Sequence, residues 1–116
     1  MKRGSHTPWG PAQHSEYIAE GIIRVDTASH GGLHLSPQRH EELQAMFRSF
    51  PTWAGGRWYE EDCDACAVIV AFPDVFPDSQ DSAREMVAWS VARNLAAGGQ
   101  SGKWQRVADY MDKVTV

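Results

Sequence analysis

The sequence predicts an α+β fold, a small antiparallel β-hairpin or three-stranded sheet packed against about four helices. Before position 36, apolar and polar residues alternate on either side of Gly31-Gly32, as in a hairpin. After position 36, apolar residues recur at helical spacing in successive segments. Because the strands come first and the helices follow, the pattern favours α+β over a parallel sheet with alternating helices. A chain of 116 residues suits one domain, placed at 1–116 with an irregular arm at 1–16.

The predicted hairpin joins a strand at 17–27 to a short strand around positions 33–35. Two strands are not independently stable, so we expect a third from the arm at 1–16 or from 114–116. The loop length decides which side chains share a face. A three-residue loop at 30–32 places both leucines of the second strand on the face of Ile23 and Val25, with His34 on the other face. A two-residue loop would place them on the charged face instead, so we favour three residues.

The first helix is predicted to begin at Ser36-Pro37, with serine as the N-cap and proline at the first helical position. Pro51 is expected to end it. A long helix follows at about 80–97, begun by Ser79 or Asp81 and ended by Gly98-Gly99. A last helix is predicted near 103–112. The apolar stripes of the three helices are Leu43, Met46, Phe47 and Phe50; Ala83, Val87, Val91 and Leu95; and Trp104, Val107, Met111 and Val114.

The segment at 58–72 is predicted to be one helix at the centre of the domain. Its first half is acidic, which suits the free N–H groups and dipole of a helix N-terminus. Its second half is apolar all round, which indicates burial. Pro73 would then stop the helix. The alternative is a buried strand, since Val68-Ile69-Val70 is β-branched and the apolar run is short.

Composition excludes some classes of function. The formal net charge of −4 disfavours direct nucleic-acid binding, which needs a basic surface to replace phosphate counterions. No apolar run approaches the roughly 20 residues that span a membrane. The N-terminus lacks the apolar region of a secretory signal, so we expect a cytoplasmic protein without a membrane association.

Cys63 and Cys66 form a C-x-x-C pair, too few cysteines for a disulfide framework. A structural zinc needs four ligands, and His30 and His34 would complete the set only if the hairpin tip met this segment. Redox use is disfavoured because neighbouring carboxylates oppose formation of a thiolate. We therefore predict no metal and no cofactor, with both cysteines filling space in the core.

Histidines and carboxylates offer a hydrolytic alternative, since a histidine oriented by a carboxylate can act as a general base. No nucleophile elbow, phosphate-binding loop or H-E-x-x-H pattern accompanies them. The residues for such an enzyme are His30, His34, Glu60, Glu61 and Asp62.

Tryptophan and acidic residues suggest a surface for a protein partner. Trp89 lies off the apolar stripe of its helix, which makes it an interface candidate among five tryptophans. The acidic residues could imitate a phosphate track if they shared one face. The partner-binding candidates are Trp89, Glu60, Glu61, Asp64, Asp74 and Asp78.

Ser29-His30-Gly31-Gly32 is interpreted as a structural latch. Two successive glycines permit a tight turn with positive φ, from which His30 would project. Such a histidine needs an acceptor where it becomes covered. The nearest plentiful acceptors are Glu60, Glu61 and Asp62, so we expect the turn to hold the hairpin against the acidic segment.

These motifs resemble a family of uncharacterised proteins from phages, plasmids and other mobile elements. The likeness covers residues 7–76, and the helices after residue 78 fall outside it. The family pattern has Trp-Ala where this chain has Ala65-Cys66, which weakens the C-x-x-C as a shared site. Trp9 and Trp58 belong to the shared structural motif. The matching stretches are Thr7-Pro8-Trp9-Gly10, Thr27-Ala28-Ser29-His30-Gly31-Gly32, Leu35-Ser36, Trp58-Tyr59-Glu60-Glu61-Asp62-Cys63-Asp64 and Ala71-Phe72-Pro73.

The resemblance implies a small accessory protein of an invading element, acting in a bacterial cytoplasm. The leading hypothesis is a non-enzymatic protein that binds a host protein. That partner would belong to a defence system, such as a CRISPR effector or a restriction enzyme. The alternative is the small hydrolase or metal-dependent enzyme described above.

Overall fold

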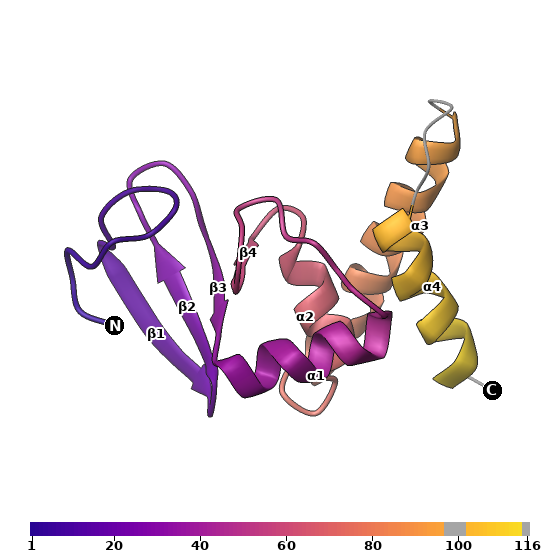
Figure 1. The fold of residues 1–116 in the computed structure, drawn as a ribbon, viewed down its shortest axis with the longest axis horizontal. Coiled ribbons are helices and arrows are strands. Elements are labelled where there is room, and N and C mark those ends of the chain that lie inside the picture. Colours follow the sequence, from indigo (N-terminus) through magenta and orange to yellow (C-terminus); the bar gives the residue numbers. More distant parts are fainter. Residues whose placement is uncertain (97–101, 115–116) are drawn as a thin grey trace.

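The computed structural model describes residues 1–96 and 102–114 and confirms the α+β fold. A four-stranded antiparallel sheet, in the order β1-β2-β3-β4, lies at one end of the molecule, and α3 and α4 lie at the other, with α1 and α2 between them (Figure 1). The sheet has one strand more than predicted. The elements are β1 (His14–Ala19), β2 (Ile22–Asp26), β3 (Gly31–Leu35), α1 (Pro37–Phe47), β4 (Trp58–Glu60), α2 (Ala65–Ala71), the 3₁₀ turn η1 (Pro77–Ser79), α3 (Gln80–Ala96) and α4 (Gly102–Val114).

The single strand predicted at 17–27 is wrong, because a turn at Glu20-Gly21 divides it into β1 and β2. Gly21 has a φ of +79°, which side-chain-bearing residues rarely adopt. A Cβ there would also lie 2.6 Å from the Ser36 hydroxyl oxygen. The additional strand, β1, begins at His14 within the predicted arm at 1–16. The C-terminal option is wrong for Val114, which ends α4, whereas 115–116 lie outside the described residues.

The predicted hairpin register is also wrong. Leu35 pairs with Ile22 and Leu33 pairs with Arg24, so the leucines lie on the face opposite to Ile23 and Val25. His34 pairs with Ile23. The loop at 27–30 has four residues rather than three, and the Thr27 hydroxyl closes it with a 2.7 Å hydrogen bond to the His30 carbonyl. The Thr27 backbone N–H donates to the same carbonyl at 2.9 Å, so the loop is closed at Thr27 and His30 and not at the glycine pair.

Gly31 and Gly32 are not turn residues, because both belong to β3. Their lack of a side chain is required by close neighbours instead. A Cβ on Gly31 would lie 2.8 Å from an Asp26 carboxylate oxygen. A Cβ on Gly32 would collide with the Tyr59 carbonyl of β4 and approach the Trp9 ring to 2.8 Å. The second glycine thus lets Trp9 lie directly on the sheet.

The helix predicted at 58–72 is wrong in its first half. Trp58–Glu60 forms the edge strand β4 on β3, a turn follows, and only Ala65–Ala71 is helical. The acidic residues do not complement a helix N-terminus, since α2 has no acidic residue in its first turn and Asp64 makes no cap hydrogen bond. The buried second half is confirmed. Helix α2 packs against β3, β4, α1, α3 and α4, which puts it at the centre of the core.

The start of α1 is confirmed, since the Ser36 hydroxyl accepts a hydrogen bond from the Arg39 backbone N–H at 3.2 Å. The helix ends before Pro51, at Phe47, with Arg48 in the left-handed conformation. Phe50 is nevertheless fully buried. The Gln44 side chain holds it there, because its amide nitrogen donates to the Phe50 carbonyl at 2.8 Å.

The predicted stripes of the two C-terminal helices are confirmed in part, since Val91 and Met111 are half-buried and Val114 is 56% exposed. Ala83 and Val87 of α3 and Trp104 and Val107 of α4 are buried. The predicted end of α3 at Gly98-Gly99 and the side chain of Leu95 lie outside the described residues. Within residues 1–96 and 102–114, no helix has the length and apolarity needed to cross a membrane.

A buried carboxylate joins α4 to the turn before α2. Asp64 is fully buried and lies 2.9 Å from the Lys103 ammonium of α4. Its other oxygen accepts a 2.7 Å hydrogen bond from the Trp53 backbone N–H. Lys103 also donates to the Pro51 carbonyl at 3.0 Å. This ion pair therefore connects three segments that are distant in the sequence.

Helix α2 provides a test of the core. We expect Val70→Asp to abolish the cooperative thermal transition, because Val70 is 5% exposed and an unpaired buried charge costs several kcal/mol. The neighbouring Ile69→Asp is the graded comparison: Ile69 packs against the same core but is only partly buried, so its variant should be destabilised less and should still melt cooperatively. Circular dichroism melts of the two variants measure the difference. A wild-type melt for Val70→Asp would contradict this description of the core.

The ion pair provides a second test. Replacing Lys103 by alanine leaves the Asp64 charge buried without its counterion, so we expect the free energy of unfolding to fall by about 3 kcal/mol. Lys113→Ala, at an exposed position of the same helix, should change it by no more than about 0.5 kcal/mol. Urea denaturation gives both values. Equal effects of the two substitutions would show that the pair contributes no more than a surface charge.

Candidate functional site

The N-terminal arm brings Trp9 onto the face of the sheet above Gly32. The arm is fixed by Thr7, which is 2% exposed; its hydroxyl donates to the Gly10 carbonyl at 2.6 Å and accepts from the Trp9 backbone N–H at 3.1 Å. The Trp9 ring meets Trp58 of β4 edge to face, with centroids 5.6 Å apart. His34 stacks on the Trp58 ring, with centroids 4.0 Å apart. Three separate motifs thus form one aromatic cluster.

His34 is part of this cluster rather than a free base. Burial lowers the pKa of His34, and the nearby positive charge of Arg57 lowers it further. A neutral imidazole stacked on an indole is a packing element. Among the described residues, no ion pair joins His34 to a carboxylate, as a catalytic role would require.

The loop at 27–30 is attached to the arm. The Ser29 hydroxyl donates to the Trp9 carbonyl at 3.1 Å, and the Thr27 hydroxyl contacts the same oxygen at 3.3 Å. His30 lies beside Glu60, with 3.9 Å between the Nδ1 and Oε1 atoms. These contacts place the Ser29-His30 turn between the arm and β4, whereas the predicted latch involved only the acidic segment.

The acidic residues after Trp58 have different surroundings. Glu60 is nearly buried, and burial raises its pKa, with the negative charge of Asp62 raising it further. Glu61 lies 3.4 Å from the Arg24 guanidinium on the opposite face of the sheet. Asp62 is exposed, and Asp64 is the internal partner of Lys103. The cluster in the sequence is therefore dispersed in space.

A depression lies beside the aromatic cluster, with a volume of about 390 Å³. We call it the tryptophan depression. Trp53 on its rim is 74% exposed, although its backbone N–H is held by buried Asp64. An exposed ring on an anchored backbone is suited to binding. The lining residues are Pro8, Trp9, Ser29, His30, Trp53 and Ala54.

Trp53 was not among the predicted site residues. Its only signal in the sequence is a large side chain inside the glycine-rich connection at 51–57, which is longer than a simple helix-to-strand turn needs. None of the residues that were predicted to bind a partner lines the tryptophan depression. Trp89 is 55% exposed on α3, and Asp74 and Asp78 are exposed in the connection between α2 and α3.

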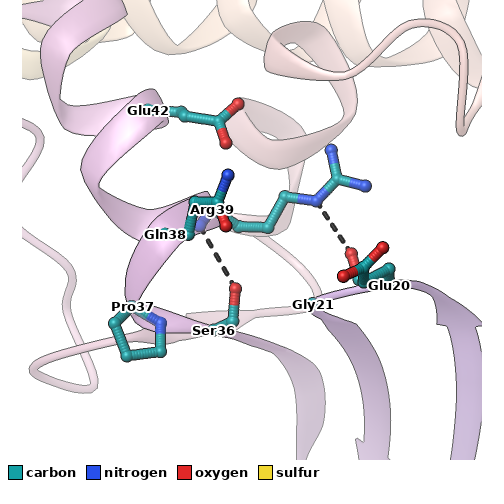
Figure 2. Close-up of a pocket in the computed structure, with 7 residues that line it drawn as sticks. All are labelled: Glu20, Gly21, Ser36, Pro37, Gln38, Arg39 and Glu42. Carbon is teal, nitrogen blue, oxygen red and sulfur yellow. Dashed lines mark hydrogen bonds between the residues drawn. The ribbon is translucent and has the colours of Figure 1, made fainter.

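A larger depression of about 560 Å³ lies where the β1–β2 turn meets the start of α1 (Figure 2). Hydrogen bonds join several of the residues that line it. Arg39 donates from Nε to the Glu20 carbonyl at 2.9 Å, and its backbone N–H donates to Ser36 (Figure 2). The Arg39 guanidinium also lies 4.7 Å from the Phe72 ring centroid. These contacts join the sheet to α1. The polar groups of this depression are therefore explained by the connection between the two elements.

The two cysteines are unsuited to metal or redox chemistry. Burial, followed by the negative charge of Asp64, raises the pKa of Cys63 to about 11 and also raises that of Cys66. Both thiols therefore stay protonated at neutral pH, whereas metal ligation and thiol exchange need thiolates. Among the residues that the structure describes, no three His, Cys, Asp or Glu side chains are placed to hold a metal.

The raised pKa of Glu60 predicts a pH-dependent effect. The folded state binds this proton more tightly than the unfolded state, so the contribution to stability is greatest below the ordinary pKa of 4.5 and is lost as the pH rises through the folded value. Glu60→Gln removes the ionising group. We expect this variant to be more stable than the wild type at pH 7, with the gain absent at pH 4.

Urea denaturation at the two pH values measures the Glu60→Gln effect. Glu61→Gln is the matched control, because its carboxylate is 38% exposed and paired with Arg24. This neighbour should show no gain at pH 7. A Glu60→Gln variant that is destabilised to the same extent at both pH values would show that the carboxylate is needed for its contacts and not for its charge.

A family model described as "Domain of unknown function (DUF7007)" matches residues 2–111. No curated protein and no solved structure matches the chain. The match agrees with the expected likeness to uncharacterised proteins, and it extends past residue 76 to include α3 and most of α4. The chain belongs to the DUF7007 family.

Proposed function

We propose that this protein is a non-enzymatic binding module that attaches to a host protein through the tryptophan depression. The observation that carries the proposal is Trp53, which is 74% exposed while its backbone is hydrogen-bonded to buried Asp64. Aromatic anchors contribute a large share of binding energy at protein interfaces. An anchor whose backbone is already fixed loses less conformational entropy on binding.

The surroundings of Trp53 favour a protein partner over a small molecule. The tryptophan depression is shallow and open, with an exposed indole on its rim and half-exposed His30 beside it. A small-molecule site buries most of its ligand, which this shape does not offer. The net charge of −4 favours a partner with a basic surface.

The more specific proposal concerns the partner's class. Basic surfaces are typical of proteins that bind nucleic acids. The resemblance of the Pro-Trp-Gly, Ser-His-Gly-Gly and Trp-Tyr-Glu-Glu-Asp-Cys motifs to proteins of mobile elements adds a biological setting. Together they support a bacterial defence effector as the host partner, of the CRISPR or restriction type, which the protein would inhibit in the cytoplasm.

The second candidate function is hydrolysis, and one observation favours it. His30 lines the tryptophan depression and has Glu60 beside it, although their 3.9 Å separation is longer than the hydrogen bond by which a carboxylate orients a base. The other groups of that hypothesis are engaged elsewhere, since His34 stacks on Trp58 and Glu61 pairs with Arg24. The Ser29 hydroxyl beside His30 already donates to the Trp9 carbonyl, so binding remains the better supported proposal.

The two functions respond differently to substitution. We expect Trp53→Ala to reduce recovery of the host partner by at least about tenfold in a quantitative pull-down from host lysate, because truncated hot spots cost 2 kcal/mol or more. The matched control is Tyr17→Ala, which removes a ring that is 73% exposed on β1. This control should recover the partner like the wild type. Equal recovery with both variants would exclude the tryptophan depression as the contact.

A functional assay tests the defence proposal separately. The protein is expressed in a host with an active CRISPR or restriction system, and the efficiency of plasmid transformation or phage plating is measured. Inhibition should raise the efficiency, and Trp53→Ala should abolish that effect whereas Tyr17→Ala should not. Loss of activity with His30→Ala but not with Trp53→Ala would favour the hydrolase instead.

A further inference from the structure

Helix α3 has two different faces. Its inner face packs against the core and includes Ala83, Val87 and Ser90, which are all buried. The opposite face carries residues at helical spacing, and every one of them is exposed. We call it the α3 stripe, and its members are Ser82, Glu85, Met86, Trp89 and Arg93.

The centre of the α3 stripe is apolar. Trp89 is 55% exposed and Met86 is 37% exposed, and with Ser82 and Glu85 they line a shallow hollow of about 440 Å³. The Arg93 guanidinium lies 5.0 Å from the Trp89 ring centroid and covers part of the indole. An exposed tryptophan beside a methionine, with charges at both ends, has the composition of an interface: an apolar centre and a polar rim.

The charges of the α3 stripe are placed symmetrically about Trp89. Glu85 precedes it by four residues and Arg93 follows it by four, so the three form one row along the helix. Rows with this spacing are the ridges that interlock when two helices cross at about −50°, the commonest packing class. With a two-fold axis beside Trp89, the rows of the two copies would lie antiparallel. This arrangement would place each Glu85 beside Arg93 of the other copy.

We propose that the α3 stripe is a homodimer interface, and that its occupant is the same stripe of a second copy of this chain. A closed two-fold contact uses one patch on both subunits, so the patch must be complementary to itself. The α3 stripe meets this condition, with one acid and one base at equal distances from a central aromatic residue. In the described part of the chain, Glu85 makes no ion pair that would compete.

A partner of a different kind would need a different charge pattern. A basic partner would be matched by an acidic stripe, and an acidic partner by a basic one. The row of Glu85, Trp89 and Arg93 has no net charge, because it is negative at one end and positive at the other. That order complements its own reversal, which is what a second copy presents.

Charge reversal tests the pairing. The Glu85→Arg variant would place two arginines together at each end of the interface, and the Arg93→Glu variant would place two glutamates together. We expect the wild type to be dimeric in analytical ultracentrifugation and each single variant to weaken dimerisation at least about tenfold. Both positions are exposed, so the variants should fold, and thermal melts check this.

Restoration is the decisive part of the experiment. The double variant Glu85→Arg/Arg93→Glu recovers opposite charges at both ends, and so does an equimolar mixture of the two single variants. We expect dimers in both samples. Glu41→Arg on the exposed side of α1 is the matched control and should stay dimeric like the wild type. A monomeric wild type at about 100 µM, dimeric single variants, or failure of both the double variant and the mixture to dimerise would each overturn the proposal.

Discussion

The buried carboxylate of Asp64 is the contact on which most of the arrangement depends. A charge without solvent is stable only if it is paired and hydrogen-bonded, and Asp64 has both kinds of partner in Lys103 and the Trp53 backbone. Lys103 adds the Pro51 carbonyl. The ion pair therefore determines where α4 lies against the core and how the connection at 51–57 enters β4. The position of Trp53 on the surface follows from an interaction inside the protein.

A second constraint acts at the sheet. Because Gly32 has no side chain, the Trp9 ring can lie against the sheet beside β4. That position lets Trp9 meet Trp58, and Trp58 in turn stacks on His34. The Trp9 carbonyl of the arm accepts a hydrogen bond from the Ser29 hydroxyl, which attaches the loop at 27–30 to the arm. The two constraints together form the tryptophan depression, since one places Trp9 and Ser29 on its lining and the other places Trp53.

The sequence predicted those features that depend on nearby residues. Ser36-Pro37 begins α1 because capping is a contact within one turn, and the stripes of α3 and α4 follow from helical spacing. The failures involve contacts over long distances. Gly31-Gly32 resembles a turn, but its neighbours are Trp9 and Tyr59 from other segments. Asp64 resembles the acidic start of a helix, but its partner is 39 residues away.

The candidate site was predicted only in part. The contact of His30 with Glu60 was among those expected from the motifs, whereas the contact of Trp9 with Trp58 was not. Nor was the exposure of Trp53 predicted, since exposure of a tryptophan depends on where the rest of the chain packs. Glu60, Glu61, Asp62 and Asp64 look alike in the sequence, yet burial, an arginine, solvent and a lysine give them four different environments.

The two proposed surfaces lie in different parts of the molecule, which has a functional consequence. The tryptophan depression belongs to the sheet end, whereas α3 lies at the opposite end (Figure 1). Dimerisation through the α3 stripe would leave both depressions outside the shared interface, since the two surfaces have no lining residue in common. A dimer of this kind binds with two sites, and after the first contact the second is made at an effective concentration of the order of millimolar. A partner with two equivalent sites within reach would then be held more tightly than either depression could hold it alone. Such pairing adds affinity without any new contact at either depression.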